Sequence, residues 1–404
     1  MSTPKSRVAP VWVSGPLASY ADGFKESLGE KGYTALSRVN QLRLMGHLSN
    51  WLADERLTVS DLNAAHVEEF LLVRRAAGYT ALRTTEALAP LLDFLRVKGV
   101  LPEPAEAAAK SAVELVLASF GRYLLSERAL ATSTAAAYVA RVDRFLAGCA
   151  ADGDLSSVTA GDVTRAVLDE SATQSVGSVQ FFVVAVRAFL RFCCLEGLID
   201  VDLSTAAPSM TGRRTPVLPQ GIERRDGQSL LASCDRRQVI GRRDHAVLLL
   251  LIRLGLRAGE VARLRLDDFD WHAGQIMVPG KGGRHDLLPL PAEVGESVAG
   301  YLRRGRPATT RREVFLTAIA PLSSLTRGSV STIVRAACQR AGVAPIGAHR
   351  LRHTLACDMV AAGTPLPEIG QVLRHRHLSS TTIYAKVDIV QLRTLALPWP
   401  GESL

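Results

Sequence analysis

Histidines and arginines crowd together between positions 349 and 377, where four of the nine histidines of this 404-residue chain lie. His349 and His353 are four residues apart, which would place two zinc ligands on one helix face, but Arg350 stands where that motif has a glutamate. The arginines that flank these histidines, at positions 350, 352, 374 and 376, would repel a divalent cation. The segment therefore argues against a metal site, and we expect neither a metal nor an organic cofactor.

The same composition suits a phosphate anion. Guanidinium groups grip phosphate oxygens in bidentate geometry, and do so best where water is partly excluded. Tyr384 follows this segment, and only one other tyrosine lies beyond position 138. The arginines that would form the anion site are Arg257, Arg350, Arg352, Arg374 and Arg376. For Arg350 and Arg376, a solvated basic face is an alternative interpretation.

Lysine is scarce in this chain. Only seven of the 48 basic residues are lysines, and Lys281 is the only one between Lys110 and Lys386. Arginine is in effect never deprotonated in proteins, whereas the pKa of a lysine can be tuned by its surroundings. Lys281 lies in the glycine-rich turn Gly280–Gly283. We interpret it as a residue that can give up a proton there, and the alternative is a simple contact with a backbone phosphate.

Taken in order, these residues resemble the catalytic motifs of the tyrosine recombinases, the phage-integrase family. Gly255–Val261 is similar to the family's first motif, with Arg257 as its first active-site arginine. Lys281 resembles the lysine that this family carries on a β-hairpin. His349 and Arg352 fit the family's H-x-x-R box.

Leu373–Tyr384 is similar to the closing motif of the family, with His375 as the phosphate-contacting imidazole and Tyr384, nine residues later, as the nucleophile.

The sequence departs from the family pattern at two places. Ala258–Gly259 replaces a bulkier residue followed by serine, and Arg374 occupies a position that is usually glycine. Neither removes a catalytic side chain, but Arg374 is expected either to tighten phosphate binding or to disturb the turn that aims His375.

The resemblance implies cleavage of DNA by attack of a tyrosine on a phosphodiester. Tyr384 would form a 3′-phosphotyrosine and expel a 5′-hydroxyl, so that the bond energy is stored and neither ATP nor a metal is required. Arg257 and Arg352 would neutralise the two non-bridging oxygens in the transition state, where electrostatic preorganisation is usually the largest catalytic contribution.

Proton transfer has its own candidates, again by resemblance. Tyr384 has a reference pKa of about 10, so it needs a base, and His349 is the candidate. Lys281 would protonate the leaving 5′-oxygen as the general acid. His375 would hydrogen-bond to the scissile phosphate. His353 is expected to support the structure rather than to act in the chemistry.

Helices must position most of these residues. Apolar residues recur at three- and four-residue spacing throughout the first 205 residues, which is typical of amphipathic helices. The pattern occurs twice, and the two occurrences align at an offset of about 95 residues. Val59–Val67 aligns with Leu155–Val163, and Phe94–Arg96 aligns with Phe189–Arg191. We interpret the two occurrences as a duplicated four- or five-helix unit, although amphipathic helical bundles in general share such patterns.

The expected fold is mainly α and multidomain, with helical, SAM-like DNA-binding domains followed by a mixed α+β catalytic domain. The catalytic domain would carry a small β-hairpin, with strands near Gln275–Val278 and Asp286–Leu290. The family resemblance covers residues 217–388 closely. The predicted boundaries are an N-terminal arm- or core-binding-like domain at 1–105, a core-binding domain at 106–207, a linker at 208–220, the catalytic domain at 221–388 and a tail at 389–404.

Charge and composition narrow the class of partner and the compartment. The net charge of +9 and a pI near 9.5 favour a polyanion. The six cysteines form no C-x-x-C pair, which is typical of reduced thiols in the cytoplasm. Met1–Pro16 lacks the apolar core of a signal peptide. The longest apolar run considered, Ala246–Ile252, is far below the roughly 18 residues of a membrane span, so we expect a cytoplasmic protein without a membrane partner.

The function that these observations and the resemblance favour is site-specific DNA recombination by the integrase or transposase of a mobile element. The expected partners are double-stranded DNA at a specific site and three further copies in a synaptic homotetramer, with sister recombinases of the same element as further candidates. The tail would dock on a neighbouring copy through Leu392, Leu395, Leu397 and Trp399. Two alternatives stay open: a type IB topoisomerase-like strand transferase, and a catalytically inactive DNA-binding regulator.

Overall fold

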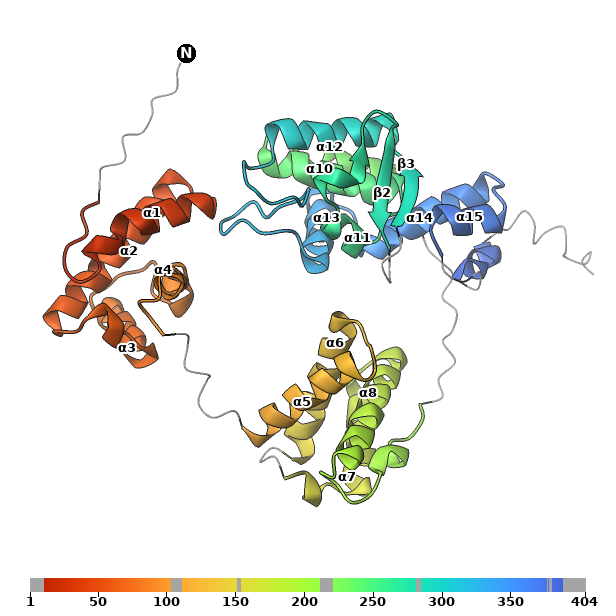
Figure 1. Ribbon diagram of the computed structural model, residues 1–404. Helices are drawn as coiled ribbons and strands as arrows, with labels where there is room; N and C mark the ends of the chain where they lie inside the picture. Colours follow the sequence, from red (N-terminus) through yellow and green to blue (C-terminus); the bar gives the residue numbers. More distant parts are fainter. Residues whose placement is uncertain are drawn as a thin grey trace, which may run out of the picture. The chain divides into compact units, whose positions relative to one another are not determined.

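The computed structural model describes residues 11–102, 111–150, 154–210, 221–280, 285–375, 377 and 380–387. Within these ranges the chain is mostly helical, with one small sheet (Figure 1). By its internal contacts the chain falls into two compact units, Pro102–Val217 and the remainder, Met1–Leu101 with Leu218–Leu404. Each region is described by itself below.

The first region contains four α-helices and two short 3₁₀ turns. Its core is a single buried cluster that extends from Leu17 to Leu101, in which the rings of Phe24 and Phe94 pack with their centroids 5.5 Å apart. The elements are η1 (Ala18–Tyr20), α1 (Ala21–Glu30), α2 (Ala35–Asp54), η2 (Val59–Asp61), α3 (Ala64–Ala76) and α4 (Thr85–Val97).

The second region is also a helical bundle with its own core. Its longest helix, α8, buries ten side chains in a cluster that includes Phe120 and Phe189. The elements are α5 (Ala112–Ser126), α6 (Thr132–Cys149), η3 (Leu155–Ser157), α7 (Ala160–Thr173), α8 (Val176–Leu195) and η4 (Leu203–Ala206).

Helix α8 corrects one detail of the sequence analysis. By length and composition it is the one helix among the described residues that could span a membrane, and it is longer than the apolar run Ala246–Ile252. Its apolar face is occupied by the bundle's own core, as expected for a central helix of a helical domain.

The order of elements agrees with the predicted repeat. In each region a long helix is followed by a 3₁₀ turn and then by a helix with a polar N-cap, which is Asn63 for α3 and Thr159 for α7. The last helix of each region ends in a glycine with left-handed backbone, Gly99 (φ +70°) after α4 and Gly197 (φ +68°) after α8. Glycine suits these positions because a left-handed residue with a Cβ is strained.

The third region carries the motifs and mixes helices with a sheet. Antiparallel strands β1, β2 and β3 pair in that order, and Met277 lies opposite Leu287. The elements are α9 (Arg224–Ala232), α10 (Val239–Arg253), α11 (Ala258–Arg263), η5 (Leu266–Asp268), β1 (Phe269–Asp270), β2 (Gln275–Pro279), β3 (His285–Pro289), α12 (Ala292–Arg304), α13 (Arg327–Ala341), α14 (Ala348–Ala361), α15 (Leu366–Val372) and η7 (Thr382–Val387). The predicted hairpin is confirmed, and the two-residue strand β1 extends it.

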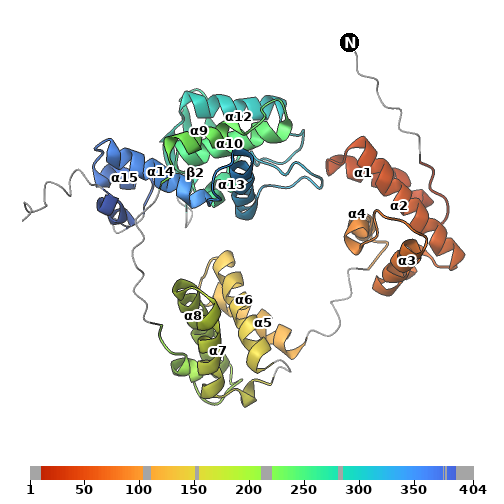
Figure 2. The ribbon, with the colours of Figure 1, turned by 180° about the vertical axis from the view of Figure 1, so that it is seen from behind.

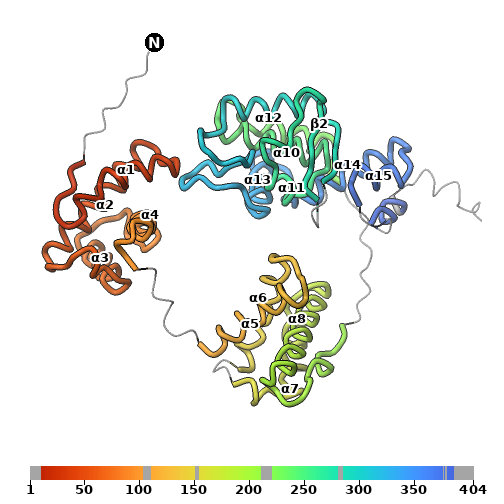
Figure 3. The backbone as a smooth tube through the Cα atoms, in the orientation of Figure 1, coloured from red at the N-terminus to blue at the C-terminus, as the bar shows by residue number. Residues whose placement is uncertain are grey.

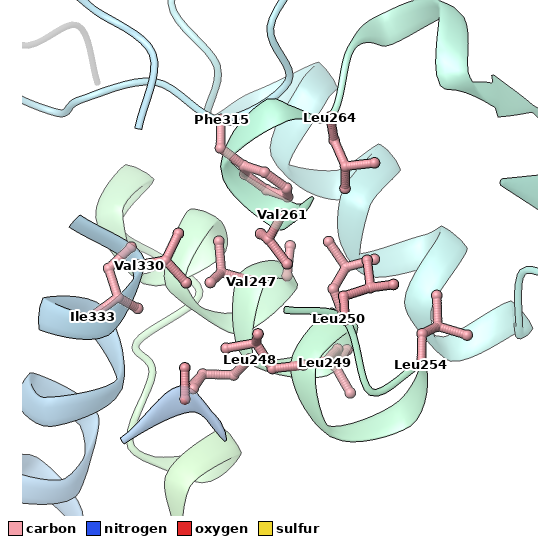
Figure 4. Packing of buried hydrophobic residues seen from close by; sticks show 14 of the residues in the cluster. Val247, Leu248, Leu249, Leu250, Leu254, Val261, Leu264, Phe315, Val330 and Ile333 are labelled. Carbon is pink, nitrogen blue, oxygen red and sulfur yellow. The ribbon is translucent and has the colours of Figure 1, made fainter. Parts of the chain in front are cut away.

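Helix α10 is the centre of this region. It lies beside α12 in the front view and in the view from behind (Figures 1 and 2), and its residues from Ala246 to Leu251 are fully buried. Figure 4 shows Leu248, Leu249 and Leu250 of α10 packed among side chains from α11 and α13. This apolar segment of α10 is buried on all sides, as expected for a stretch of helix without a polar face.

A second, smaller cluster joins α14, α15 and η7. It contains Val360, Ile369, Leu373 and Tyr384, which are all buried. The backbone tube in Figure 3 follows the chain from α13 through α14 to α15. This cluster holds the end of the described chain against the helix that carries the H-x-x-R box.

The predicted domain boundaries remain predictions. The three large buried clusters lie within residues 17–101, 117–207 and 230–351, which agrees with the expected division. The boundary at 105/106, most of the linker 208–220 and the tail 389–404 fall outside the described residues.

Candidate active site

Arg257 stands at the N-cap of α11, directly after the core helix α10. Its backbone N–H donates to Oε2 of Glu260 at 2.8 Å, and its Nη1 donates to Oε1 of the same carboxylate at 2.7 Å. The Arg257 side chain is 45% exposed, whereas that of Glu260 is 4% exposed. Glu260 therefore holds the backbone and the side chain of Arg257 in place, while the guanidinium remains accessible to solvent.

Arg352 is almost completely buried on α14, with 1% of its surface exposed. Its Nη1 donates to the carbonyl of Gly255 at 2.6 Å, and its Nη2 donates to the carbonyl of Leu373. Burial, and then the positive charges of Arg257 and Arg374, lower the pKa of Arg352 to about 9. Arg352 thus connects the turn before Arg257 with the turn that precedes His375.

His349 and His353 lie one helical turn apart on α14, with ring centroids 4.3 Å apart and the rings in an edge-to-face arrangement. Burial lowers the pKa of His349, and the positive charges of Arg352, Arg257 and Arg327 lower it further. His349 is therefore neutral near pH 7 and has a basic nitrogen available.

Tyr384, on η7, is 1% exposed and belongs to the small cluster with α14 and α15. Its hydroxyl oxygen lies 2.7 Å from Nδ1 of His353, a hydrogen bond between two groups 31 positions apart in the chain. Burial raises the pKa of Tyr384 to about 12, although the positive charge of Arg352 acts in the opposite direction. The phenol is thus held in its neutral form, against the helix that carries His349 and Arg352.

His375 follows the turn after α15. Its Nδ1 lies 2.8 Å from the hydroxyl of Thr381, and its ring is parallel to that of Tyr384 with centroids 6.4 Å apart. Burial lowers the pKa of His375 to about 4, with further contributions from Arg352 and Arg257. Thr381 is itself buried, so it fixes which way the imidazole faces.

Arg374 departs from glycine without disrupting the turn that aims His375. Its φ of +55° is left-handed, and the N–H groups of Arg374 and His375 still donate to the carbonyls of Gln371 and Gly370, each at 2.9 Å. The side chain turns inward, and its Nη2 donates to Oε2 of Glu260 at 2.8 Å. The turn before His375 therefore keeps these two backbone hydrogen bonds with an arginine at position 374.

Two predicted site residues, Lys281 and Arg376, lie outside the described residues. Strand β2 ends at Pro279 and β3 begins at His285, so the strands on either side of the lysine-bearing turn are placed. Asp286 of β3 lies 3.9 Å from Nε of Arg374, which brings this end of the hairpin to the site.

Arg350 does not belong to a solvated basic face. It is partly buried, and its Nη2 donates to the carbonyl of Gly221 at 3.1 Å. Its neighbour Arg352 points the other way, into the site, because residues two apart on a helix face different directions. For Arg350 the structure therefore favours a role in holding the start of the third region.

The described part of the site brings together Arg257, His349, Arg352, His375 and Tyr384. It also includes residues that sequence reasoning missed or assigned only to structure. The sequence carried a signal for the role of Glu260, because a glutamate three residues after an N-cap residue commonly accepts a hydrogen bond from the backbone N–H of that residue. Thr381 offered no such signal, because a threonine beside a tyrosine motif can equally face solvent.

No three His, Cys, Asp or Glu side chains in the described ranges lie close enough together to hold a metal ion.

This fold and this arrangement of side chains define a DNA-joining enzyme of one family. Residues 221–389 match the phage integrase family, and residues 117–197 match the phage integrase N-terminal SAM-like domain. The chain therefore belongs to the phage integrase family of tyrosine recombinases, enzymes that break and rejoin DNA strands.

Its relatives are named recombinases. It is 41% identical over 395 residues to the putative integrase/recombinase y4rA of Sinorhizobium fredii, an alignment that covers 96% of each chain. It is 31% identical over 307 residues to the tyrosine recombinase XerD of Mycobacterium tuberculosis, which covers 71% of this chain and 96% of XerD. The first alignment is long enough to include the N-terminal region that the family matches leave out.

Solved structures show the same fold at low identity. The XerH site-specific recombinase bound to its palindromic difH substrate matches with a TM-score of 0.54 and 16% identity, over 82% of this chain and 94% of that one. Lambda integrase (75–356), bound as a dimer to a COC′ core site, matches with a TM-score of 0.51 and 17% identity, over 67% and 94%.

Proposed function

We propose that this protein is the integrase or transposase of a mobile element, which recombines DNA at a specific site through a 3′-phosphotyrosine intermediate. The observation that carries the proposal is the contact of Tyr384 with α14, the helix that carries His349 and Arg352. The ring of His375 lies parallel to that of Tyr384, and Arg352 is joined to the turn before Arg257 through Gly255. This set matches the chemistry of phosphodiester transfer to a tyrosine.

In the proposed mechanism Arg257 and Arg352 hold the two non-bridging oxygens of the scissile phosphate. Arg352 keeps its positive charge at neutral pH, because even a pKa of about 9 leaves it protonated there. The pentavalent transition state carries more negative charge than the phosphodiester, so two preformed guanidinium groups stabilise it more than they stabilise the substrate.

Proton movement completes the step. The oxygen of Tyr384 forms the new bond to phosphorus and gives its proton to His349, whose lowered pKa keeps it neutral and able to accept. The bond from phosphorus to the 5′-oxygen breaks, and Lys281 donates a proton to that oxygen. His375 hydrogen-bonds to the phosphate, while His353 holds the tyrosine hydroxyl until the phosphate is in place. Rejoining reverses these transfers with a new 5′-hydroxyl, without metal or ATP.

The proposed partner is duplex DNA, held by four protomers at synapsis, with sister recombinases as further candidate partners, in the cytoplasm. Residues 221–387 hold 25 of the 48 basic residues and 14 of the 39 acidic ones. Most of the positive charge that can release counterions from DNA is therefore in the third region.

A covalent-trapping assay tests the function. The protein and its Tyr384→Phe variant are mixed, with a chelator present, with nicked duplex fragments tiled across the native flanks of the gene. The nick lets the 5′-hydroxyl fragment diffuse away, so the cleaved complex cannot religate. We expect an adduct that resists denaturation with the native chain and none with Tyr384→Phe, because the variant lacks the nucleophile.

The outcomes of this assay also separate the alternatives. An adduct at one site supports recombination at that site. Adducts at many unrelated sequences, together with relaxation of supercoiled DNA by the monomer, would favour a type IB topoisomerase-like activity. Bound fragments without any adduct would favour the inactive regulator and contradict the proposal.

A further inference from the structure

Arg374, which stands where the family pattern has glycine, is held in an unusual way in the site. Its side chain is 4% exposed, and its backbone is left-handed, a conformation that strains any residue with a Cβ. Its Nε and Nη1 atoms are buried without a hydrogen-bond partner among the described residues. Buried, unpartnered donors on a cation are unfavourable unless something else is gained.

The one short ion pair of Arg374 within the described ranges is with Glu260. Nη2 of Arg374 and Oε2 of Glu260 are 2.8 Å apart, and both side chains are 4% exposed. The second carboxylate in range, Asp286, is 3.9 Å from Nε and 40% exposed. A buried pair is screened far less than an exposed one, so Glu260 is the electrostatic partner that matters.

Glu260 binds two arginines at once. Its Oε1 accepts from Nη1 of Arg257 at 2.7 Å while its Oε2 accepts from Nη2 of Arg374. Burial raises the pKa of Glu260, but the charges of Arg374 and Arg257 and the hydrogen bonds from Arg257 outweigh it and hold the pKa below its ordinary value. The carboxylate is therefore negative at neutral pH, next to an arginine that must neutralise phosphate.

Counting charges shows what Arg374 contributes. Arg257 and Arg352 bring two positive charges to the phosphate, and Glu260 would cancel one of them. With Arg374 present, the three arginines and one buried glutamate leave two positive charges. A phosphodiester brings one negative charge, and the attack by the tyrosine adds another.

We propose that Arg374 is a positioning residue that cancels the charge of Glu260, so that Arg257 and Arg352 both act on the scissile phosphate with their full charge. Glu260 can then hold Arg257 in place without weakening it. This inference rests on the proposed function, since it concerns the same phosphodiester transfer.

The first test is Arg374→Gly in the trapping assay. Glycine accepts φ +55° without strain, so the turn before His375 is kept while the charge is removed. We expect adduct formation to slow by about 10- to 100-fold, less than or equal to the loss of a direct oxyanion donor. Arg374→Lys keeps the charge and should stay within about fivefold of the native rate; if it is as slow as Arg374→Gly, the proposal is overturned.

The second test asks whether Arg374 acts through Glu260. In Glu260→Gln/Arg374→Gly both charges are gone, and the amide oxygen can still accept a hydrogen bond from Arg257. The rate of adduct formation should therefore be at least tenfold higher than that of Arg374→Gly. A double variant as slow as Arg374→Gly alone would overturn the proposal. Thermal unfolding of each variant checks that the fold is kept.

The third test separates charge from packing. A methylphosphonate at the scissile position lacks one charged non-bridging oxygen, so its transition state needs less positive charge. The ratio of native to Arg374→Gly rates should fall to below about threefold on this substrate. An equal ratio on both substrates would show a structural effect and overturn the inference. A native chain that forms no adduct on any substrate would instead contradict the proposed function.

Discussion

Burial and positive charge act on the site histidines in the same direction. The pKa of His353 and that of His375 are lowered to about 4, first by burial and then by neighbouring histidines and arginines. Burial raises the pKa of Tyr384 to about 12. Near neutral pH these three side chains are uncharged. The positive charge that meets the phosphate therefore resides on the arginines, which do not lose it.

These shifts predict how stability depends on pH. His353 has a pKa of about 4 in the folded chain and an ordinary pKa of 6.5, so between those values the unfolded chain binds a proton that the folded chain does not. The contribution of neutral His353 to the free energy of unfolding is therefore complete above pH 6.5 and is lost as the pH falls towards 4. Between pH 7 and pH 5 the loss should be about 1 kcal/mol for this histidine, allowing for partial exposure.

Denaturant unfolding of His353→Gln at the two pH values measures this contribution. Glutamine does not titrate and can still hydrogen-bond to Tyr384, so the difference between pH 7 and pH 5 should shrink by about 1 kcal/mol. His272→Gln, at an exposed position in the β1–β2 turn, is the matched control and should keep the native difference. An unchanged pH dependence in His353→Gln would contradict the shift.

For single residues, the sequence predicted which side chains come together, but it did not predict all the contacts that hold them in place. The spacing of the motifs identified Arg257, His349, Arg352, His375 and Tyr384, all of which the described structure brings together. It did not reveal that His353 would contact Tyr384, because the H-x-x-R box is formed by His349 and Arg352 and gives His353 no partner. A contact between residues 31 positions apart depends on how η7 returns to α14, which no local pattern encodes.

Among the elements, the turn between α10 and α11 is tightly constrained. Gly255 has φ +56°, and a Cβ there would lie 2.9 Å from Leu355 and 3.1 Å from Leu373. Gly255→Ala is therefore expected to reduce the free energy of unfolding by about 2–4 kcal/mol, from backbone strain and overpacking together. It should also slow cleavage, because the Gly255 carbonyl holds Arg352.

Gly274→Ala provides the matched control, measured by the same denaturant titration. Gly274 has a similar φ of +61°, but a Cβ there would meet no atom within 4 Å. Its cost should be confined to backbone strain, about 1–2 kcal/mol. Equal losses in the two variants would mean that the close approach to Leu355 and Leu373 does not matter.

Element types followed from the sequence where periodicity was long. The helices of the first two regions and the hairpin around Gly280 were predicted, because three- to four-residue spacing and a glycine-rich turn are strong local signals. The strand β1 was missed because two residues, Phe269–Asp270, carry no alternation of their own. The last described element, η7, is a short 3₁₀ turn at Thr382–Val387, whose position is fixed by Tyr384 packing on α14.

For the whole molecule, the proposed assembly depends on the tail, residues 389–404, which lies outside the described residues. Its apolar residues, among them Leu392 and Trp399, are the reason to expect docking on a neighbouring copy. Deletion of 389–404 should lower formation of the four-protomer complex while leaving binding of a single protomer to DNA largely intact. Gel-shift titration on one and on two duplex sites measures both, and unchanged synapsis would contradict the assignment.

The distribution of charge makes a last prediction for the molecule as a whole. Residues 1–110 hold 13 basic and 12 acidic residues, and 111–210 hold 7 and 11, so the net positive charge lies almost entirely in the third region. Each phosphate contact by a cation makes the fall of log K with log salt steeper by about 0.9. We therefore expect the third region to supply most of the phosphate contacts that make DNA binding depend on salt.

Arg327 and Arg83 allow this prediction to be tested in the full chain. Both are exposed, and Arg327, at the start of α13, is one of the charges that lower the pKa of His349, a residue of the proposed site. Arg327→Gln should weaken DNA binding at every sequence and reduce the salt slope by about one, whereas Arg83→Gln in the neutral first region should leave it unchanged. Equilibrium binding between about 50 and 200 mM salt measures the two slopes. Equal slopes for the two variants would mean that the first region contributes phosphate contacts as strongly as the third, despite its balanced charge.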